Sequence, residues 1–179
     1  PRFEDYWRQY HALTERRGVT PAAAKNLVRS RSTLIAALMV ERGEADAMIC
    51  GLVGSYHKKL GYLRSVFDFD RGVTGTAAMT AVINNLGAWF FLDTHVQVDP
   101  SAEQIAEATL QATWRLKLFG IEPKVALLSH SNFGSHDNAS AAKMRRAREL
   151  IKARAPKLEV EGEMQADAVW APDLDRSID

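Results

Sequence analysis

Apolar residues recur at helical spacing in the first quarter of the chain, which predicts three successive helices. Residues 3–17 place Phe3, Tyr6, Trp7, Tyr10 and Leu13 on one helical face, and the glycine at position 18 would end that helix. The next two residues, a threonine and a proline, are of the types preferred at an N-cap and a first helical position. They predict a second helix over residues 21–29. A third helix is expected to begin at residue 32 or 33 and to stop at the glycine at position 43.

Further along, short apolar runs alternate with helical segments. Residues 45–50 and 124–129 are predicted to be buried parallel strands. Residues 77–83 and 89–93 are predicted to form a hairpin through residues 84–87. Helices are predicted over residues 55–67, 101–120 and 141–153, with a turn at 70–72, a short strand at 158–160 and a last unit beginning at residue 162. This alternation is typical of an α/β fold, a three-layer αβα arrangement with a largely parallel sheet.

Composition narrows the classes of function. The 179 residues include 23 Lys and Arg against 22 Asp and Glu, so the net charge is +1 and gives no general attraction to nucleic acid or to a membrane. Recognition of an anion must therefore be local. The single cysteine excludes a disulfide within the chain, and no apolar run approaches the ~20 residues that span a bilayer. We expect a cytoplasmic protein, and the missing initiator Met indicates a piece of a longer one.

Ligands of open α/β folds bind beyond the carboxyl ends of the strands, where residues 50–57 are the first candidate segment. Gly51 and Gly54 allow close approach of the backbone to a ligand. Ser55 begins a helix whose free N–H groups suit an anion. The GxxG spacing matches neither a dinucleotide fingerprint nor a Walker loop, so an ordinary turn explains it equally well. His57 is either a proton donor or a polar wall.

Residues 128–135 are the second candidate segment. Ser129, Ser131, Asn132 and Ser135 follow an apolar strand directly. Such a loop can hold phosphate or carboxylate oxygens through its side-chain and backbone donors. The alternative is that these side chains satisfy only nearby backbone groups.

Two further groups of polar residues remain open. Asp93 and His95 lie at another strand end, where they are either a catalytic pair or part of a loop that a structural Asp holds by hydrogen bonds. Arg64 lies on the helix that follows residues 50–57 and could reach back to a phosphate. Arg29 and Arg31 flank a helix junction and are weaker candidates, and the cations of residues 145–154 are interpreted as a solvated helix face.

Five stretches also resemble a known family: residues 43–51, 91–94, 99–104, 119–129 and 162–168. They are similar to the phosphate acetyl/butaryl transferase family over nearly the whole chain. Residues 50–57 and 130–135 are most similar to the C-terminal, transacetylase-like domain of bacterial NADP-dependent malic enzymes. The resemblance implies a phosphotransacetylase fold, related to isocitrate dehydrogenase. It also implies that residues 1–179 are the N-terminal lobe and the start of the second lobe, truncated at both ends.

The resemblance implies a regulatory role. In malic enzymes the domain is expected to sense acetyl-CoA and to assemble into a homo-oligomer, while NADP and a divalent metal bind to a catalytic domain that is absent here. The chain also lacks the Asn-Asp-Leu-Ser-Arg-Gly type segment of the transferases, so no catalytic residue is predicted. The alternative is a fragment of a phosphate acetyltransferase, which moves acetyl between CoA and phosphate.

Individual positions follow from the same resemblance. Arg64 matches a position that faces CoA or acyl phosphate, residues 129–132 match a phosphate-side loop, and residues 165–167 match a segment that lines the cleft. The predicted acetyl-CoA or phosphate ligands are Gly54, Ser55, His57, Arg64, Ser129, Ser131, Asn132, Gly134, Ser135, Gln165 and Asp167. No metal ligand is predicted in this chain.

Overall fold

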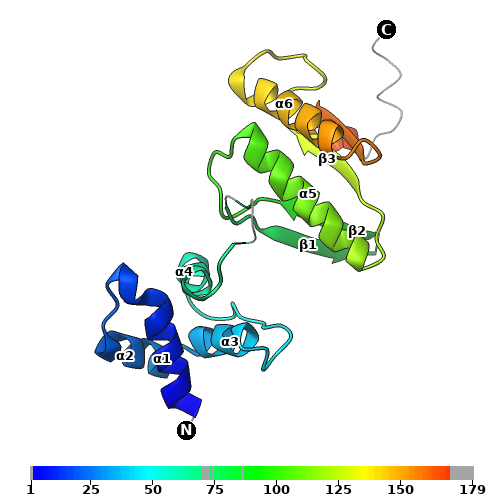
Figure 1. Cartoon of the computed structure of the whole chain (residues 1–179). Helices are drawn as coiled ribbons and strands as arrows, with labels where there is room; N and C mark the ends of the chain where they lie inside the picture. Colours follow the sequence, from blue (N-terminus) through cyan, green and yellow to red (C-terminus); the bar gives the residue numbers. More distant parts are fainter. Residues whose placement is uncertain (1, 70–72, 74, 86, 170–179) are drawn as a thin grey trace. The chain divides into compact units, whose positions relative to one another are not determined.

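The structure of the chain is a computed structural model that describes residues 2–69, 73, 75–85 and 87–169 (Figure 1). The chain divides into two compact units, Pro1–Gly72 and Val73–Asp179. Each unit has a hydrophobic cluster of its own, so the two are described separately.

The described part of the first unit contains four α-helices, and all four were predicted. They are α1 (Arg2–Thr14), α2 (Pro21–Ser30), α3 (Ser32–Glu41) and α4 (Tyr56–Val66), with a short 3-10 helix η1 (Glu15–Arg17) after α1. Local signals set the boundaries. Gly18 ends η1 in the left-handed region, at φ 85°, and the Thr20 hydroxyl accepts a hydrogen bond from the Ala23 N–H at 3.2 Å.

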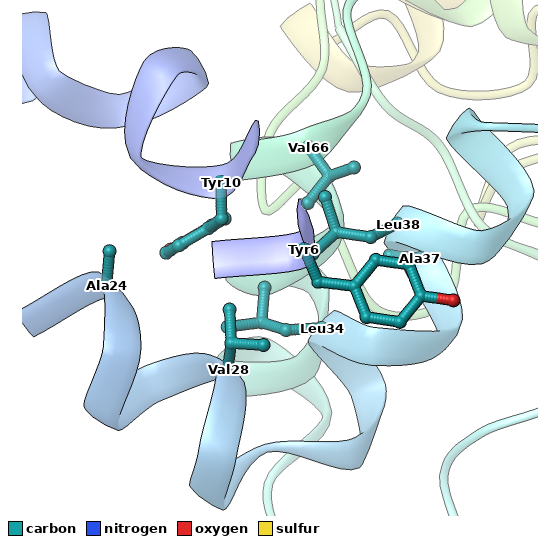
Figure 2. Packing of buried hydrophobic residues seen from close by; sticks show 8 residues of the cluster. All are labelled: Tyr6, Tyr10, Ala24, Val28, Leu34, Ala37, Leu38 and Val66. Atoms are coloured by element: carbon teal, nitrogen blue, oxygen red, sulfur yellow. The ribbon is translucent and has the colours of Figure 1, made fainter. Parts of the chain in front are cut away.

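Aromatic and aliphatic side chains from all four helices form the core of the first unit (Figure 2). Tyr6 and Tyr10 of α1 pack with Val28 of α2 and with Leu34 and Leu38 of α3, and these side chains are almost fully buried. The buried cluster consists of Tyr6, Tyr10, Ala24, Val28, Leu34, Ala37, Leu38 and Val66. Val66 is the last residue of α4, so the cluster anchors the C-terminal end of that helix.

The strand predicted over residues 45–50 is not formed. These residues adopt no strand or helix in the structure, and the side chain of Ile49 is fully exposed. A strand is stable only beside another strand, and the described part of the first unit contains none. The apolar run alone was therefore a misleading signal, and the prediction of a buried strand here is wrong.

The second unit begins with the predicted hairpin. Strand β1 (Met79–Asn84) pairs antiparallel with β2 (Gly87–Leu92), with Met79 opposite Leu92. The predicted turn at residues 70–72 and position 86 lie outside the described residues. Helix α5 (Ala102–Leu118) follows and begins with a complete capping box, in which Ser101 and Gln104 satisfy each other's backbone N–H groups.

A parallel strand pair completes the second unit. Strand β3 (Lys124–Leu128) is connected through helix α6 (Ala139–Arg154) to β4 (Glu159–Met164). Helix α6 packs against α5 (Figure 1), and both contribute to a core that includes Ala106, Leu127 and Ile151. Strand β3 is less buried than predicted, because Leu128 is exposed. Residue 162 does not begin a new unit but lies within β4, which is followed by the 3-10 helix η2 (Ala166–Val169).

The predicted α/β class with a parallel sheet is confirmed. Among the described residues, the strands form one parallel and one antiparallel pair, with no hydrogen-bonded ladder between the pairs. No helix in the described ranges is both long and apolar enough to cross a membrane.

Candidate anion-binding site

A pocket of about 780 Å³ opens in the first unit, between the α2–α3 junction and the start of α4. Most of the residues that line it have polar side chains. Hydroxyl groups come from the α2–α3 junction, from the loop before α4 and from α4 itself. The lining residues are Tyr10, Ser30, Arg31, Ser32, Thr33, Val53, Gly54, Ser55, Lys58, Lys59, Gly61, Tyr62 and Ser65.

Three of the lining residues are cationic, and none is acidic. Arg31 enters from the helix junction, and Lys58 and Lys59 enter from the first turn of α4. Within the described residues, none of these three side chains forms an ion pair. Three unpaired positive charges in one concave surface produce a local positive potential, although the whole chain has a net charge of only +1.

Local backbone structure positions these groups. Arg31 is the only residue between α2 and α3, and its extended conformation, at φ −127° and ψ 94°, separates the two helices. Gly54 has a φ of 94°, which favours glycine and turns the chain into α4. Ser55 is the N-cap of α4, but its side chain makes no capping hydrogen bond. The N–H groups of the first turn therefore face the loop without a side-chain acceptor from Ser55.

Four ligand-binding residues were predicted in this unit. Two of them, Gly54 and Ser55, line the pocket. His57 and Arg64 lie on α4 but are not among the lining residues. The His57 ring makes an edge contact with Tyr56 at a centroid distance of 5.8 Å. Arg64 is exposed in the last turn of α4, where its carbonyl oxygen accepts a hydrogen bond from Arg17 Nη1 at 3.3 Å. Their roles in ligand binding stay predictions.

The second unit brings most of its predicted residues together in the loop after β3. Ser129 Oγ accepts from the Ser131 N–H at 3.2 Å, and Ser135 Oγ accepts from the Asn132 N–H at 2.9 Å. Asn132 Oδ1 accepts from the Gln165 N–H at 2.7 Å, which joins the loop to the end of β4. Gly134 lies in the same loop, at φ 90°, whereas Asp167 is exposed in η2, where it accepts a bond from Ala168.

A buried carboxylate that the sequence did not indicate holds this loop. Glu163 is 1% exposed, and its Oε1 accepts hydrogen bonds from Ser131 Oγ, the Gly134 N–H and Arg145 Nη1, each at 2.9 Å. Burial opposes ionisation of Glu163, but these donors outweigh it and hold its pKa below the usual range for a glutamate. Arg145 therefore points inward from the helix face that was expected to be solvated.

The side chain of Asp93 resolves the choice left open at the end of β2. Its two oxygens accept hydrogen bonds from the backbone N–H groups of Ala78, His95, Val96 and Gln97, at 3.0 to 3.2 Å. Desolvation opposes ionisation, but these four donors lower its pKa. The carboxylate therefore holds the loop after the hairpin. No group of His, Cys, Asp and Glu side chains in the described residues could hold a metal ion.

Comparison with known proteins places the chain in a family. The sequence profile of the phosphate acetyl/butaryl transferase family matches residues 1–177. The chain belongs to this family. A phosphotransacetylase from Streptococcus pyogenes has a similar structure, with a TM-score of 0.80 and 27% identity, over 97% of this chain and 54% of that one. The predicted phosphotransacetylase fold is thereby confirmed.

Sequence similarity is higher to malic enzymes than to the transferases. The chain is 51% identical over 168 residues to an NADP-dependent malic enzyme of Escherichia coli (strain K12) and 48% identical to an NAD-dependent one of Rhizobium meliloti (strain 1021); each match covers 94% of this chain and 22% of the enzyme. A phosphate acetyltransferase of Synechocystis sp. (strain ATCC 27184 / PCC 6803 / Kazusa) is 34% identical over 94% of this chain and 24% of the enzyme. The chain thus spans about a fifth of the length of the malic enzymes.

Proposed function

We propose that this chain is the regulatory, acetyl-CoA-sensing and oligomerising part of an NADP-dependent malic enzyme. The observation that carries the proposal is the 51% identity to a malic enzyme over 94% of the chain, against 34% to a phosphate acetyltransferase. The matched stretch is the C-terminal region of the malic enzyme. The basic pocket supports the choice of ligand, because acetyl-CoA carries several phosphate groups that cations bind well.

In this proposal the chain itself performs no chemistry. NADP and the divalent metal bind to the catalytic domain of the parent protein, which oxidatively decarboxylates malate to pyruvate in the cytoplasm. Acetyl-CoA prefers one state of the homo-oligomer and shifts the population toward it. The shift lowers malate oxidation by a coupling of about 1–3 kcal/mol between the two sites.

The experiment uses the full-length protein that contains this chain. Malate-dependent NADPH formation is followed as acetyl-CoA is added, and the affinity for acetyl-CoA is measured with and without saturating malate and NADP. We expect inhibition, together with a loss of acetyl-CoA affinity equal to the loss of malate and NADP affinity, because coupling between binding sites is reciprocal. Saturable binding of acetyl-CoA that leaves malate oxidation unchanged would contradict the regulatory proposal.

Family membership favours a second candidate, a phosphate acetyltransferase, because the S. pyogenes phosphotransacetylase shares the fold. The same sample therefore receives acetyl-CoA and phosphate, and acetyl phosphate is measured. Turnover would establish the transferase and overturn the proposal of a non-catalytic regulatory part. Sedimentation of the same protein tests the homo-oligomer.

A further inference from the structure

We propose that the pocket of Arg31, Lys58 and Lys59 is a phosphate-binding site that takes the diphosphate and the ribose phosphate of acetyl-CoA. The assignment of the phosphates to acetyl-CoA rests on the proposed function, whereas the phosphate site itself rests on the pocket alone. All three cations belong to the first unit, as do the other residues that line the pocket.

The charged residues that line the pocket are all cationic. Many other cations of the chain lie beside a carboxylate: Arg8 beside Glu4, and Lys117 beside Glu122. The three cations of the pocket have no such partner among the described residues, and no Asp or Glu lines the pocket. Like charges that share a concave surface repel one another. An anion bound between them attracts each cation and offsets this repulsion.

The neutral residues that line the pocket add hydrogen-bond donors. Ser32, Thr33 and Ser55 bring hydroxyl groups to the pocket, and a hydroxyl can donate to a phosphate oxygen, which only accepts. The Ser30 hydroxyl instead donates to the Asn26 carbonyl oxygen at 2.8 Å. The guanidinium of Arg31 has a planar set of donors that matches two oxygens of one phosphate. The ammonium groups of the two lysines act as point charges on a flexible stem. This combination of donors favours phosphate over a neutral ligand.

The size of the pocket favours a ligand larger than inorganic phosphate. A volume of about 780 Å³ lies within the range of ~300–1,000 Å³ of small-molecule pockets. It exceeds what one inorganic phosphate needs, whereas a nucleotide with a diphosphate and a further phosphate would use all three cations. Tyr62 and Val53 supply apolar lining against which the organic part of such a ligand can pack.

The experiment titrates the full-length protein with pyrophosphate and, separately, with acetyl-CoA by calorimetry. The variants are Arg31→Gln, Lys58→Gln and Lys59→Gln, each of which removes one charge and changes no core residue. Arg16→Gln is the matched control, because Arg16 is exposed in the same unit and lines no part of the pocket. We expect each pocket variant to weaken both ligands about tenfold, Arg31→Lys to lose less than Arg31→Gln, and Arg16→Gln to change neither.

The outcomes separate this inference from the proposed function. If acetyl-CoA binds and the three pocket variants leave its affinity unchanged, the site is wrong and the regulatory proposal stands. If acetyl-CoA does not affect malate oxidation, but pyrophosphate binds and is lost in the pocket variants, the phosphate site stands and the regulatory proposal fails. An equal loss in Arg16→Gln would show a general effect of charge and overturn the inference.

Discussion

Glu163 is the residue on which the loop after β3 depends most. Replacing it with glutamine removes the negative charge that faces Arg145 and leaves a buried amide with unsatisfied donors. We expect Glu163→Gln to destabilise the second unit by about 2 kcal/mol. Hydrogen exchange of the amides of residues 131–136 measures the effect. Glu161→Gln is the control, because Glu161 is 52% exposed in its pair with Arg148 and should cost less than about 1 kcal/mol. Equal effects of the two variants would contradict this role for Glu163.

The same carboxylate makes the loop sensitive to acid. Burial of Glu163 raises its pKa in the folded protein. Hydrogen bonds from Gly134, Ser131 and Arg145 outweigh burial, so the pKa lies below its usual value. The unfolded state therefore binds the proton more readily. The stabilisation is fully present above the unfolded pKa of about 4.3 and is lost as the pH falls through the lower, folded value. Amide hydrogen exchange of this loop, corrected for its intrinsic pH dependence, measures the effect. We expect exchange to increase less on acidification in Glu163→Gln than in the unchanged protein.

At the scale of single residues, the sequence predicted which polar side chains gather in the loop after β3. It did not predict which carboxylate is buried beneath them. Ser131, Asn132 and Gln165 were expected to lie together because their types and positions after a strand are local signals. Glu163 was missed because strand alternation puts it on the same side as the exposed Glu161. A register shift opposite Leu127 and Leu128 makes Glu163 the extra residue of a bulge and turns it inward. No pattern in one strand shows an irregularity of the pair.

Among the elements, helices could be predicted and strands only in part. A helix satisfies its backbone within itself, and its boundaries follow caps such as Thr20 and Ser101. A strand requires a partner, which an apolar run does not specify. Residues 124–128 find one in β4, whereas residues 45–50 find none in the described part of their unit.

The pocket was only half predicted for a similar reason. Gly54 and Ser55 form a local motif, but Arg31 joins them through tertiary packing.

The pairing of β3 with β4 depends on a glycine. Gly162 has a φ of 123°, and a Cβ atom at this position would lie 2.5 Å from the carbonyl oxygen of Leu127. We expect Gly162→Ala to disrupt the parallel pair and to lower the thermal midpoint of the second unit by several degrees. Gly120→Ala is the matched control, because Gly120 also has a positive φ, of 73°, but nothing lies within 4 Å of its Cβ position. It should cost only the backbone strain, about 1–2 kcal/mol. A smaller effect of Gly162→Ala than of Gly120→Ala would contradict the expected clash.

For the whole molecule, the balance of charge and its distribution have different consequences. A net charge of +1 gives no long-range attraction to polyanions, so binding of a phosphate ligand has to come from a few residues. The structure concentrates three cations in one pocket of the first unit. In the second unit, by contrast, Arg145, Arg148 and Lys152 are matched by Glu161 and Glu163. Affinity for a phosphate ligand should therefore depend on the first unit.

The two hydrophobic clusters predict how the chain unfolds. Leu38 belongs to the first cluster and Ile151 to the second, and both side chains are fully buried. Replacing either with alanine leaves a cavity that costs about 2–5 kcal/mol. Because each cluster draws its residues from one unit only, we expect each variant to raise hydrogen exchange mainly in its own unit. Leu38→Ala should also weaken pyrophosphate binding, whereas Ile151→Ala should leave it unchanged. Leu118→Ala is the control, because this leucine is 64% exposed and its loss creates no cavity. Equal loss of protection in both units after Leu38→Ala would show that the chain unfolds as one cooperative body, and the phosphate pocket would then depend on the core of the second unit as well.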